Sequence, residues 1–319
     1  MPEHGRSATE LHCHLDGSVR PQTIAELARQ QGIELAGPVD VISRVRPSCT
    51  SLVEYISAID VALDVLQTPD ALYRAAYELV EDWHADGVGH GEARFAPNLH
   101  RRRGLDLPTI IDAVASGLGD GAGVTGVATR LILCTLRPAD PEATWSVVEA
   151  AATHDAVIGV DVAGPEAGVS LLPHAPAFRA ARDAGLRITV HAGEADGPRS
   201  VWDAVDELGA ERIGHGVRSV SDARLLRRLA TDGIALEVCP TSNVQTNAVP
   251  SITEHPIDRL REAGVPVTVS CDARTASDVT LASERALLER TFGWTRDDWG
   301  AVQASAERAA FAERRVTAS

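Results

Sequence analysis

The sequence predicts an α/β fold, namely a (β/α)8 barrel of the TIM type with a helical insertion after strand one. Eight short β-rich runs alternate along the chain with longer segments of helical spacing. Such alternation predicts a parallel sheet, because each parallel crossover needs a connecting segment. Eight of these units favour closure into a barrel. An open doubly wound sheet remains an alternative on the count alone, although no Gly-x-Gly-x-x-Gly motif follows the first strand.

The expected elements follow one another in a regular order. The strand-like runs are Glu10–Leu15, Gly89–Phe95, Ala128–Leu136, Val157–Ala163, Arg187–His191, Arg212–His215, Ala235–Val238 and Val267–Cys271. The helix-like stretches include Pro21–Gln31, Pro69–Asp86, Pro141–Ala152, Ala175–Asp183, Val201–Glu207 and Asp222–Thr231. Several of them begin with Pro or a polar capping residue, as helices commonly do. The first two or three helices are expected to form the insertion after strand one.

Length and composition bear on the domain organisation. The chain has 319 residues, of which 44% are hydrophobic. This length could accommodate two domains, but barrels of alternating strands and helices commonly contain as many residues. We therefore expect residues 1–319 to form a single domain. No apolar run approaches the roughly 20 residues that a membrane-spanning helix requires.

The charge balance indicates which partners to expect. Lys and Arg total 30 against 45 Asp and Glu, which gives a formal net charge of -15. A chain with this charge repels polyanions, so we expect neither nucleic-acid nor anionic-membrane binding. The run Arg101–Arg103 is interpreted as a solvated loop. A small molecule is the expected partner, and the sequence makes no prediction of oligomeric state.

Cysteine usage and the first residues favour a cytoplasmic location. The five cysteines are odd in number and scattered, which is not typical of a disulfide framework, and none forms a Cys-x-x-Cys pair. The first nine residues are polar and lack the apolar core of a signal segment. Both observations favour a reducing cytoplasm.

A pair of histidines on the first strand is the first candidate for chemistry. His12 and His14 are two residues apart, so their imidazoles lie on one face of a strand. In a barrel that face is the interior, close to the C-terminal rim where active sites form. Two imidazoles there make half of a metal site, whereas on an exposed strand they would be two unrelated polar residues.

Three other strand ends also carry ionisable groups. One strand ends at His191 and is followed by Glu194, another ends at His215, and the last is followed by Asp272. The C-terminal ends of barrel strands are where catalytic residues gather. Three histidines and a carboxylate form a plausible ligand set for zinc, with a further position left for water.

Several segments together resemble the adenosine deaminase family over almost the whole chain. The matching segments are Leu11–Arg20 (LHCHLDGSVR), Glu92–His100 (EARFAPNLH), Gly159–Glu166 (GVDVAGPE), Val190–Glu194 (VHAGE), Arg212–Gly216 (RIGHG) and Glu237–Thr246 (EVCPTSNVQT). A His-x-His pair alone is shared by many amidohydrolases. The succession of VHAGE, RIGHG and CPTSNVQT is highly specific for this family.

The resemblance implies a role for each candidate residue. It implies one zinc ion per chain, bound by His12, His14, His191 and Asp272, with Asp272 also counted among the catalytic residues. Glu194 would protonate the ring nitrogen beside the reacting carbon, and His215 would hold and help deprotonate the attacking water. Substrate contacts are implied at His14, at Asp16 towards the ribose, at the backbone of Gly164 and at the position of Ala273.

These roles are chemically reasonable in their own right. Zinc lowers the pKa of a bound water to about 7, so hydroxide is available at neutral pH. Attack on a ring carbon moves electrons onto the adjacent nitrogen, where a carboxylic acid can donate a proton. Glu194 must then be protonated in the reactive complex, which calls for a raised pKa in a desolvated pocket. His215 can orient the hydroxide and either take up its proton or stabilise its charge.

The chain departs from the family where the substrate base would bind. The family usually has a second acidic residue, or in one bacterial branch asparagine followed by arginine, after the metal-binding aspartate. Here Asp272 is followed by Ala273 and Arg274, and Ala273 offers no side-chain hydrogen bond, a loss of about 0.5–1.5 kcal/mol. The lid-like segment Ser51–Asp60 carries isoleucines where aromatic residues are common, and His90 replaces an aromatic residue.

The sequence therefore predicts a metal-dependent aminohydrolase acting on an adenosine-like nucleoside. The second hypothesis keeps the metal chemistry but assigns a modified purine, another aminated heterocycle or a non-nucleoside amide as substrate. A third hypothesis is a catalytically weak nucleoside-binding protein, which the intact Glu194, His215 and ligand set argue against. A different zinc deaminase family, with His-x-Glu and Pro-Cys-x-x-Cys motifs, is excluded because no second cysteine follows Cys239 at that spacing.

Overall fold

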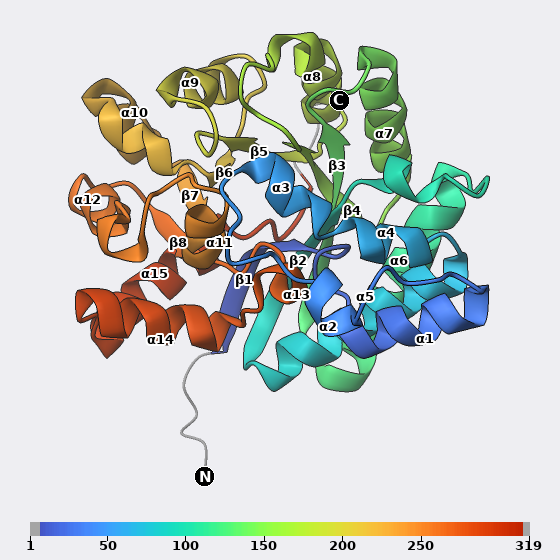
Figure 1. Ribbon diagram of the computed structural model, residues 1–319. Coiled ribbons are helices and arrows are strands. Elements are labelled where there is room, and N and C mark those ends of the chain that lie inside the picture. Colours follow the sequence, from blue (N-terminus) through green and yellow to red (C-terminus); the bar gives the residue numbers. More distant parts are fainter. Residues whose placement is uncertain (1–6, 315–319) are drawn as a thin grey trace.

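The computed structural model describes residues 7–314 and contains a closed parallel barrel (Figure 1). Eight strands pair in chain order from β1 to β8, and each neighbouring pair is parallel. The strands are β1 (Ala8–His14), β2 (Val88–Phe95), β3 (Ala128–Leu136), β4 (Val157–Ala163), β5 (Arg187–Ala192), β6 (Arg212–His215), β7 (Ala235–Val238) and β8 (Val267–Val269). A parallel bridge between Cys13 and Asp272 closes the ring. The predicted (β/α)8 barrel is confirmed.

Helices connect the strands and surround the barrel (Figure 1). The α-helices are α1 (Pro21–Gln31), α2 (Val39–Ile42), α3 (Leu52–Ser57), α4 (Asp60–Val65), α5 (Pro69–Ala85), α6 (Leu107–Thr125), α7 (Pro141–Thr153), α8 (Ala175–Asp183), α9 (Pro198–Asp206), α10 (Ala223–Asp232), α11 (Pro240–Gln245), α12 (Ile257–Glu262), α13 (Arg274–Ser277), α14 (Leu281–Phe292) and α15 (Arg296–Ala309). Short 3-10 turns are η1 (Pro97–His100), η2 (Leu172–His174), η3 (Val217–Ser221) and η4 (Ile252–Glu254).

Two predicted element boundaries differ from those in the structure, one because of a side-chain contact and one because of a proline in the first turn of a helix. The last strand was expected to reach Cys271, but β8 ends at Val269. Beyond it the Cys271 amide donates to the side-chain carboxylate of Glu10 on β1, 2.8 Å away, instead of to a backbone carbonyl of that strand. Helix α9 begins at Pro198 rather than at Val201, because Pro suits the first helical turn, where its missing N–H is not needed.

The insertion after β1 places two short helices beside the mouth of the barrel. It contains four helices, α1 to α4, rather than the expected two or three, before α5 leads into β2. The side chain of Ser51 accepts a hydrogen bond from the Glu54 amide at 3.3 Å and so caps α3. Residues from α3 and α4 line the pocket at the C-terminal ends of the strands.

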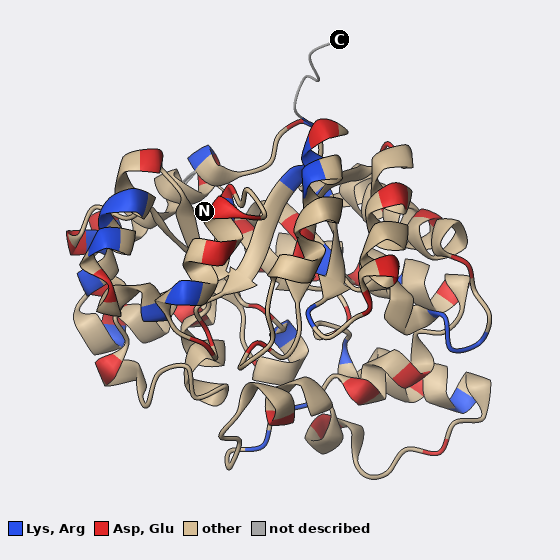
Figure 2. Cartoon of the chain, turned by 90° about the horizontal axis from the view of Figure 1, so that it is seen from above, with Lys and Arg blue, Asp and Glu red and all other residues tan. Residues whose placement is uncertain are grey.

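Acidic and basic residues are interspersed along the outer helices (Figure 2). The three arginines of the 101–103 run are exposed, and each has a different partner. Arg101 donates to Asn98, Arg102 pairs with Asp64, and Arg103 donates to Gln31. Within residues 7–314, no helix has the length and apolar character needed to cross a membrane.

Candidate metal centre and active-site pocket

Four of the predicted site residues converge at the C-terminal end of the barrel. His12 and His14 come from β1, His191 from β5, and Asp272 follows β8. The Nε2 atoms of His14 and His191 are 3.1 Å apart. The Oδ1 atom of Asp272 lies 3.6 Å from His12 Nε2 and 3.5 Å from His14 Nε2. The donor atoms of residues far apart in sequence thus face one small space.

The donor set fits a metal ion such as zinc. His12 Nε2 is buried and has no hydrogen-bond partner among the described residues. A bare nitrogen in such a position costs free energy unless a cation or donor meets it. Zinc binds imidazole nitrogen at 2.0–2.1 Å, so two ligands of a tetrahedral centre lie about 3.4 Å apart. The 3.1 Å separation of His14 Nε2 and His191 Nε2 is close to that spacing.

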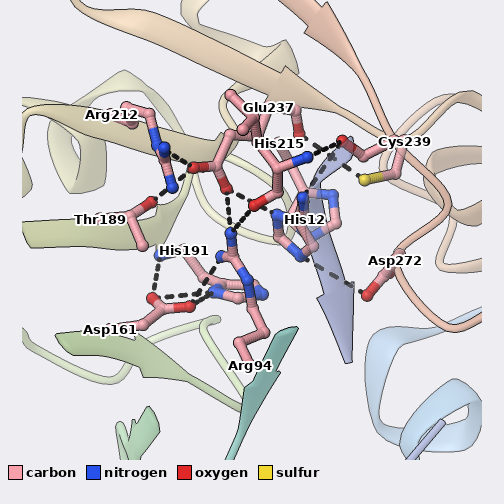
Figure 3. Close-up of polar contacts among 12 residues, drawn as sticks. His12, Arg94, Asp161, Thr189, His191, Arg212, His215, Glu237, Cys239 and Asp272 are labelled. Atoms are coloured by element: carbon pink, nitrogen blue, oxygen red, sulfur yellow. Dashed lines mark hydrogen bonds and ion pairs between the residues drawn. The ribbon is translucent and has the colours of Figure 1, made fainter. Parts of the chain in front are cut away.

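Two of the imidazoles have a carboxylate next to the ring nitrogen that faces away from the cluster (Figure 3). His12 Nδ1 lies 2.9 Å from Glu237 Oε2, and His191 Nδ1 lies 3.0 Å from Asp161 Oδ2. A histidine that binds a metal commonly donates its other ring N–H to a carboxylate, which fixes the ring and its tautomer. With the proton on Nδ1, each Nε2 presents its lone pair to the space between the ligands.

The two supporting carboxylates are joined by one buried arginine, Arg94 (Figure 3). Its guanidinium donates to Asp161 Oδ2 at 2.9 Å and to Glu237 Oε2 at 2.7 Å. Burial alone would raise the pKa of Glu237, but Arg94 and Arg212 outweigh it and hold that pKa well below the usual range. Burial would likewise raise the pKa of Asp161, but His191 and Arg94 outweigh it and hold that pKa below its usual range. Both carboxylates therefore stay ionised.

Sequence reasoning did not identify this supporting network. Arg94, Asp161 and Glu237 lie inside the expected strand runs, at positions that face the barrel interior. A charged residue in an otherwise apolar strand was a signal that could have been used. Which strand each one contacts across the barrel depends on closure and register, so the pairing was not available from the sequence.

The chain takes a strained backbone conformation at two of the candidate residues. His215 has φ 61° and Asp272 has φ 64°, values that residues other than glycine rarely adopt. Such conformations cluster at functional sites, where the surrounding structure enforces them. Asp272 is fixed further by the Ser242 hydroxyl, which donates to Asp272 Oδ2 at 2.5 Å.

Gly214 provides space for two of the imidazoles. A Cβ atom at this position would lie 3.0 Å from His12 Cε1 and 3.2 Å from His191 Cγ. We therefore expect Gly214→Ala to displace the rings and weaken zinc binding about tenfold, which competition with a chelator would measure. Gly300→Ala is the matched control, because a Cβ there meets nothing within 4 Å among residues 7–314. Equal zinc affinity in both variants would contradict this role of Gly214.

Glu194 lies in the loop after β5 and faces the pocket with a free oxygen. Its Oε1 atom is buried and has no hydrogen-bond partner in the described part of the chain. Burial, followed by the nearby Asp272 carboxylate, raises the pKa of Glu194 to about 8. The side chain is thus a carboxylic acid at neutral pH.

Glu166 holds the loop that carries Glu194. Its carboxylate accepts hydrogen bonds from four successive backbone amides, at 2.7 Å from Gly193, 2.9 Å from Glu194, 2.6 Å from Ala195 and 3.1 Å from Asp196. Buried amides need such acceptors. Sequence reasoning placed Glu166 in a matching segment but gave it no role.

His215 lies beside Glu194, with its Nε2 atom 3.7 Å from Glu194 Oε2. Burial lowers the pKa of the His215 imidazole to about 4, so the ring is neutral at pH 7. Its Nδ1 atom lies 3.0 Å from the Nδ2 atom of Asn243 on α11. The ring therefore has one edge towards Glu194 and one edge towards Asn243.

The cluster forms the floor of a pocket with about 660 Å³ of open space, including solvent at its mouth. Its lining is polar around the cluster and mostly apolar elsewhere. The lining residues are His14, Asp16, Leu52, Tyr55, Ile56, Ile59, Leu63, Ala96, Leu99, Cys134, Leu136, Ala163, Gly164, His191, Glu194, His215 and Asp272. Asp16 and Gly164, both expected to contact substrate, line this pocket, and burial raises the pKa of Asp16 to about 6.

Ala273 lies behind the pocket wall. It is fully buried, packs with Tyr55 and Ala276, and does not line the pocket formed by the described residues. A Cβ atom on Gly17 would come within 2.4 Å of Ala273 Cβ, so the two backbones pack closely here. A substrate contact from position 273 thus stays a prediction and would need a longer side chain.

Three other positions without an assigned role make structural contacts. Arg274 forms ion pairs with Glu10 at 3.1 Å and Asp86 at 2.9 Å. Exposed Asp278 pairs with Arg44 at 3.0 Å, and His90 Nε2 lies 3.5 Å from buried Glu92. None of the three lines the pocket among residues 7–314.

A (β/α)8 barrel with three imidazoles and a carboxylate converging at its C-terminal rim defines a hydrolase of the metal-dependent barrel class. The chain belongs to the adenosine deaminase family, whose model matches residues 8–318. This family carries out hydrolytic deamination and is zinc-dependent. The resemblance seen in the sequence is thereby confirmed.

Individual relatives support the same family. The chain is 39% identical to the adenosine deaminase of Mycobacterium ulcerans, over 94% of this chain and 89% of that protein. The structure is similar to adenine deaminase from Arthrobacter aurescens, with a TM-score of 0.91 and 28% identity over 97% of this chain and 95% of that one. It is also similar to a zinc-bound amidohydrolase from Burkholderia ambifaria, with a TM-score of 0.89 and 29% identity over 96% and 86% of the two chains.

Proposed function

We propose that this protein catalyses the zinc-dependent hydrolytic deamination of an adenosine-like purine nucleoside and releases ammonia. The observation that carries the proposal is the buried Glu194 carboxyl, which shares one pocket with the histidine and aspartate cluster and whose Oε1 atom has no hydrogen-bond partner among the described residues. Burial raises the pKa of this carboxyl to about 8. His12, His14, His191 and Asp272 would hold the zinc ion. When bound, zinc would supply an activated water at neutral pH by lowering the pKa of that water to about 7.

Glu194 is proposed as the acid of the reaction. Attack of water on the amino-bearing carbon of a purine moves electron density onto the neighbouring ring nitrogen. A carboxylic acid that contacts this nitrogen can protonate it as the charge develops. The raised pKa of Glu194 keeps the proton available at pH 7.

His215 and Asp272 are proposed to position the attacking water. Both reach the pocket from neighbouring regions of the rim, and His215 Nε2 is 3.7 Å from Glu194 Oε2. A water held between these groups would lie beside the acid that protonates the ring. Because the protein holds the water, the acid and the substrate ring next to one another, it lowers the entropy cost of bringing them together.

The composition of the pocket favours a nucleoside over a nucleotide. No Lys or Arg lines the pocket in the part of the chain that the structure describes. A phosphate group usually requires a cationic partner or a cluster of amide donors. Asp16 can accept a hydrogen bond from a ribose hydroxyl, and Gly164 leaves room for the base to approach the backbone. His14 is a further proposed substrate contact, whereas the contact predicted at position 273 would need a longer side chain than that of Ala273, which lies behind the pocket wall.

A modified purine is the alternative substrate. The wall near Ala273 is apolar, formed with Tyr55 and Ile59, and offers no second acid to the five-membered ring. This composition suits a base that carries an apolar substituent or lacks a hydrogen-bonding atom at that edge. Another aminated heterocycle would fit the same argument.

Ammonia release against a panel of compounds tests the substrate assignment. The panel contains adenosine, 2′-deoxyadenosine, adenosine 5′-monophosphate, adenine, 7-deaza- and 8-substituted adenosines, guanine and cytidine. We expect the largest kcat/KM for a neutral adenosine-like nucleoside. Turnover of one modified purine, without adenosine, would instead support the alternative. No release from any compound by zinc-loaded protein would contradict deamination.

The pH dependence of the rate follows from the pKa of Glu194. The reaction needs the protonated acid, and a pKa of about 8 means that this form predominates below pH 8 and is lost above it. We expect kcat/KM to fall about tenfold per pH unit above that value, because kcat/KM reports the ionisation of the free enzyme. Zinc content should be measured at each pH, so that metal loss is not mistaken for titration. A kcat/KM that stays constant to pH 10 with zinc bound would contradict the assignment.

We further propose one domain for residues 1–319 and a cytoplasmic location. All five cysteines lie within the described residues and form no disulfide, which supports a reducing compartment.

A further inference from the structure

A row of buried polar groups leads away from the pocket behind His215. His255 follows η4, Asn243 lies in α11, and His215 ends β6. The Ile257 amide nitrogen lies 3.2 Å from His255 Nδ1, and His255 Nε2 lies 3.2 Å from Asn243 Oδ1. Asn243 Nδ2 lies 3.0 Å from His215 Nδ1. The two histidines and the asparagine are all buried.

The first contact of this row fixes the tautomer of His255. A backbone amide can only donate, so His255 Nδ1 must accept the hydrogen bond from Ile257 and cannot carry a proton. Burial lowers the pKa of His255 to about 4, so the ring is neutral at pH 7. A neutral imidazole has one proton, which must be on Nε2. His255 therefore donates from Nε2 to its neighbour.

The proton on His255 Nε2 fixes the orientation of the Asn243 amide. Only the carbonyl oxygen of Asn243 can accept from His255, and this is the atom that faces it. The reverse orientation would place the NH2 group of Asn243 against the N–H group of His255, so that two buried donors would face each other without an acceptor, which costs free energy. Asn243 Nδ2 must therefore face His215 and donate to its Nδ1 atom.

His215 has its ring proton on Nε2. Its Nδ1 atom accepts a hydrogen bond from Asn243 and so carries no proton, which leaves Nε2 as the only ring nitrogen that can hold one. Nε2 is the edge that lies beside Glu194 in the pocket. The edge that would face the attacking water is thus an N–H donor and has no lone pair to offer.

We propose that His255 and Asn243 are positioning residues that lock His215 in its Nε2–H tautomer, so that His215 donates a hydrogen bond to the attacking water instead of removing its proton. The inference deepens the proposed function and rests on it. It decides between the two roles that the sequence left open for His215. The ring stabilises negative charge on the attacking oxygen, as donors to a developing oxyanion do.

The proposed reaction needs no proton transfer to His215. The attacking oxygen is the hydroxide left when the entering water has lost one proton. Glu194 gives its own proton to the ring nitrogen when the carbon–oxygen bond forms, and becomes a carboxylate. That carboxylate takes the proton of the new hydroxyl group and passes it to the amino group, the carbon–nitrogen bond breaks, and ammonia leaves. The next water re-protonates Glu194 by losing one proton as it enters the site. Glu194 therefore handles every proton, and the 3.7 Å separation of Glu194 Oε2 and His215 Nε2 puts it beside the water position.

The tautomer can be measured directly in the resting protein. Long-range proton–nitrogen NMR correlations on protein labelled with 15N-histidine distinguish a protonated ring nitrogen from a bare one. The signals of His215 are assigned by their loss in His215→Gln. In the wild-type protein we expect a proton on Nε2 and a bare Nδ1. A proton on Nδ1 with a bare Nε2 would overturn the proposal.

Asn243→Asp replaces the amide that donates to His215 by a carboxylate that accepts. An aspartate at 243 accepts but does not donate, so it draws a proton to His215 Nδ1. We expect Nδ1 to become protonated in this variant and kcat to fall about hundredfold, as on loss of an aligned donor, with KM within about threefold. Asn98→Asp, the same change at a half-buried position outside the row, should alter neither the signals nor kcat. An unchanged tautomer in Asn243→Asp would also overturn the proposal.

The two proposals fail in different ways. The NMR measurement needs no turnover, so it tests the tautomer even if no substrate is deaminated. Wild-type protein with Nε2–H and no ammonia release from any compound would remove the proposed function and leave the tautomer intact. Active wild-type protein with Nδ1–H would do the opposite. Should Asn243→Asp fail to fold, the wild-type spectrum alone decides.

Discussion

Replacing Glu194 by glutamine is expected to reduce kcat for the preferred nucleoside about 10²–10⁴-fold, the range for loss of a positioned general acid. Glutamine keeps the shape of the side chain and can still donate a hydrogen bond, but it has no proton to transfer. The pKa of about 8 for Glu194 means that the wild-type residue has this proton at neutral pH. Initial rates of ammonia release at a series of substrate concentrations would give kcat and KM.

The zinc content of Glu194→Gln separates the chemistry from the metal site. Glu194 is not one of the proposed ligands, so we expect one zinc per chain in this variant, as in the wild type. Glu207→Gln is a matched control, because it makes the same change at an exposed glutamate just after α9. Unchanged kcat in Glu194→Gln would refute its role as the acid.

Removing a ligand imidazole is expected to have the other large effect. In His191→Ala the site would lose one of four zinc ligands together with the ring that Asp161 supports. Loss of a supporting partner alone typically costs 10–100-fold in metal affinity, so we expect at least about 100-fold here. Metal analysis after dialysis against a chelator should find His191→Ala empty, and ammonia release should be lost with it.

Two further variants sharpen this test. Asp272→Asn removes the negative ligand and should also lower zinc content, although the amide oxygen remains near His12 and His14. His154→Ala is the control, because His154 pairs with exposed Asp112 outside the pocket. One zinc per chain in both His191→Ala and Asp272→Asn would contradict the assignment of these residues as ligands.

The barrel and the convergence of the cluster could be predicted from the sequence for a physical reason. Parallel strands in a barrel all end at one rim, so residues at strand ends meet there whatever their separation in the chain. The structure accordingly brings His12, His14, His191 and Asp272 together. Their roles, and that of His215, stay predictions that the variants above test.

Other features depend on geometry that a single sequence does not contain. Arg94 joins Asp161 and Glu237 only because barrel closure places three strands around its side chain. The tautomer of His215 depends on the orientation of one amide, that of Asn243. Ala273 looked like a missing substrate contact, but its packing against Gly17 behind the wall follows from the backbone path after Asp272, where φ is positive.

The most direct test of the account is a zinc titration of metal-free protein, in which bound metal and the rate of ammonia release from adenosine are followed together. The account predicts that both rise in parallel and saturate at one zinc per chain in the wild type. In Glu194→Gln the metal should bind with the same stoichiometry while the rate stays low. Full activity without metal, or one bound zinc in the wild type with no ammonia from any purine nucleoside, would contradict the central claim.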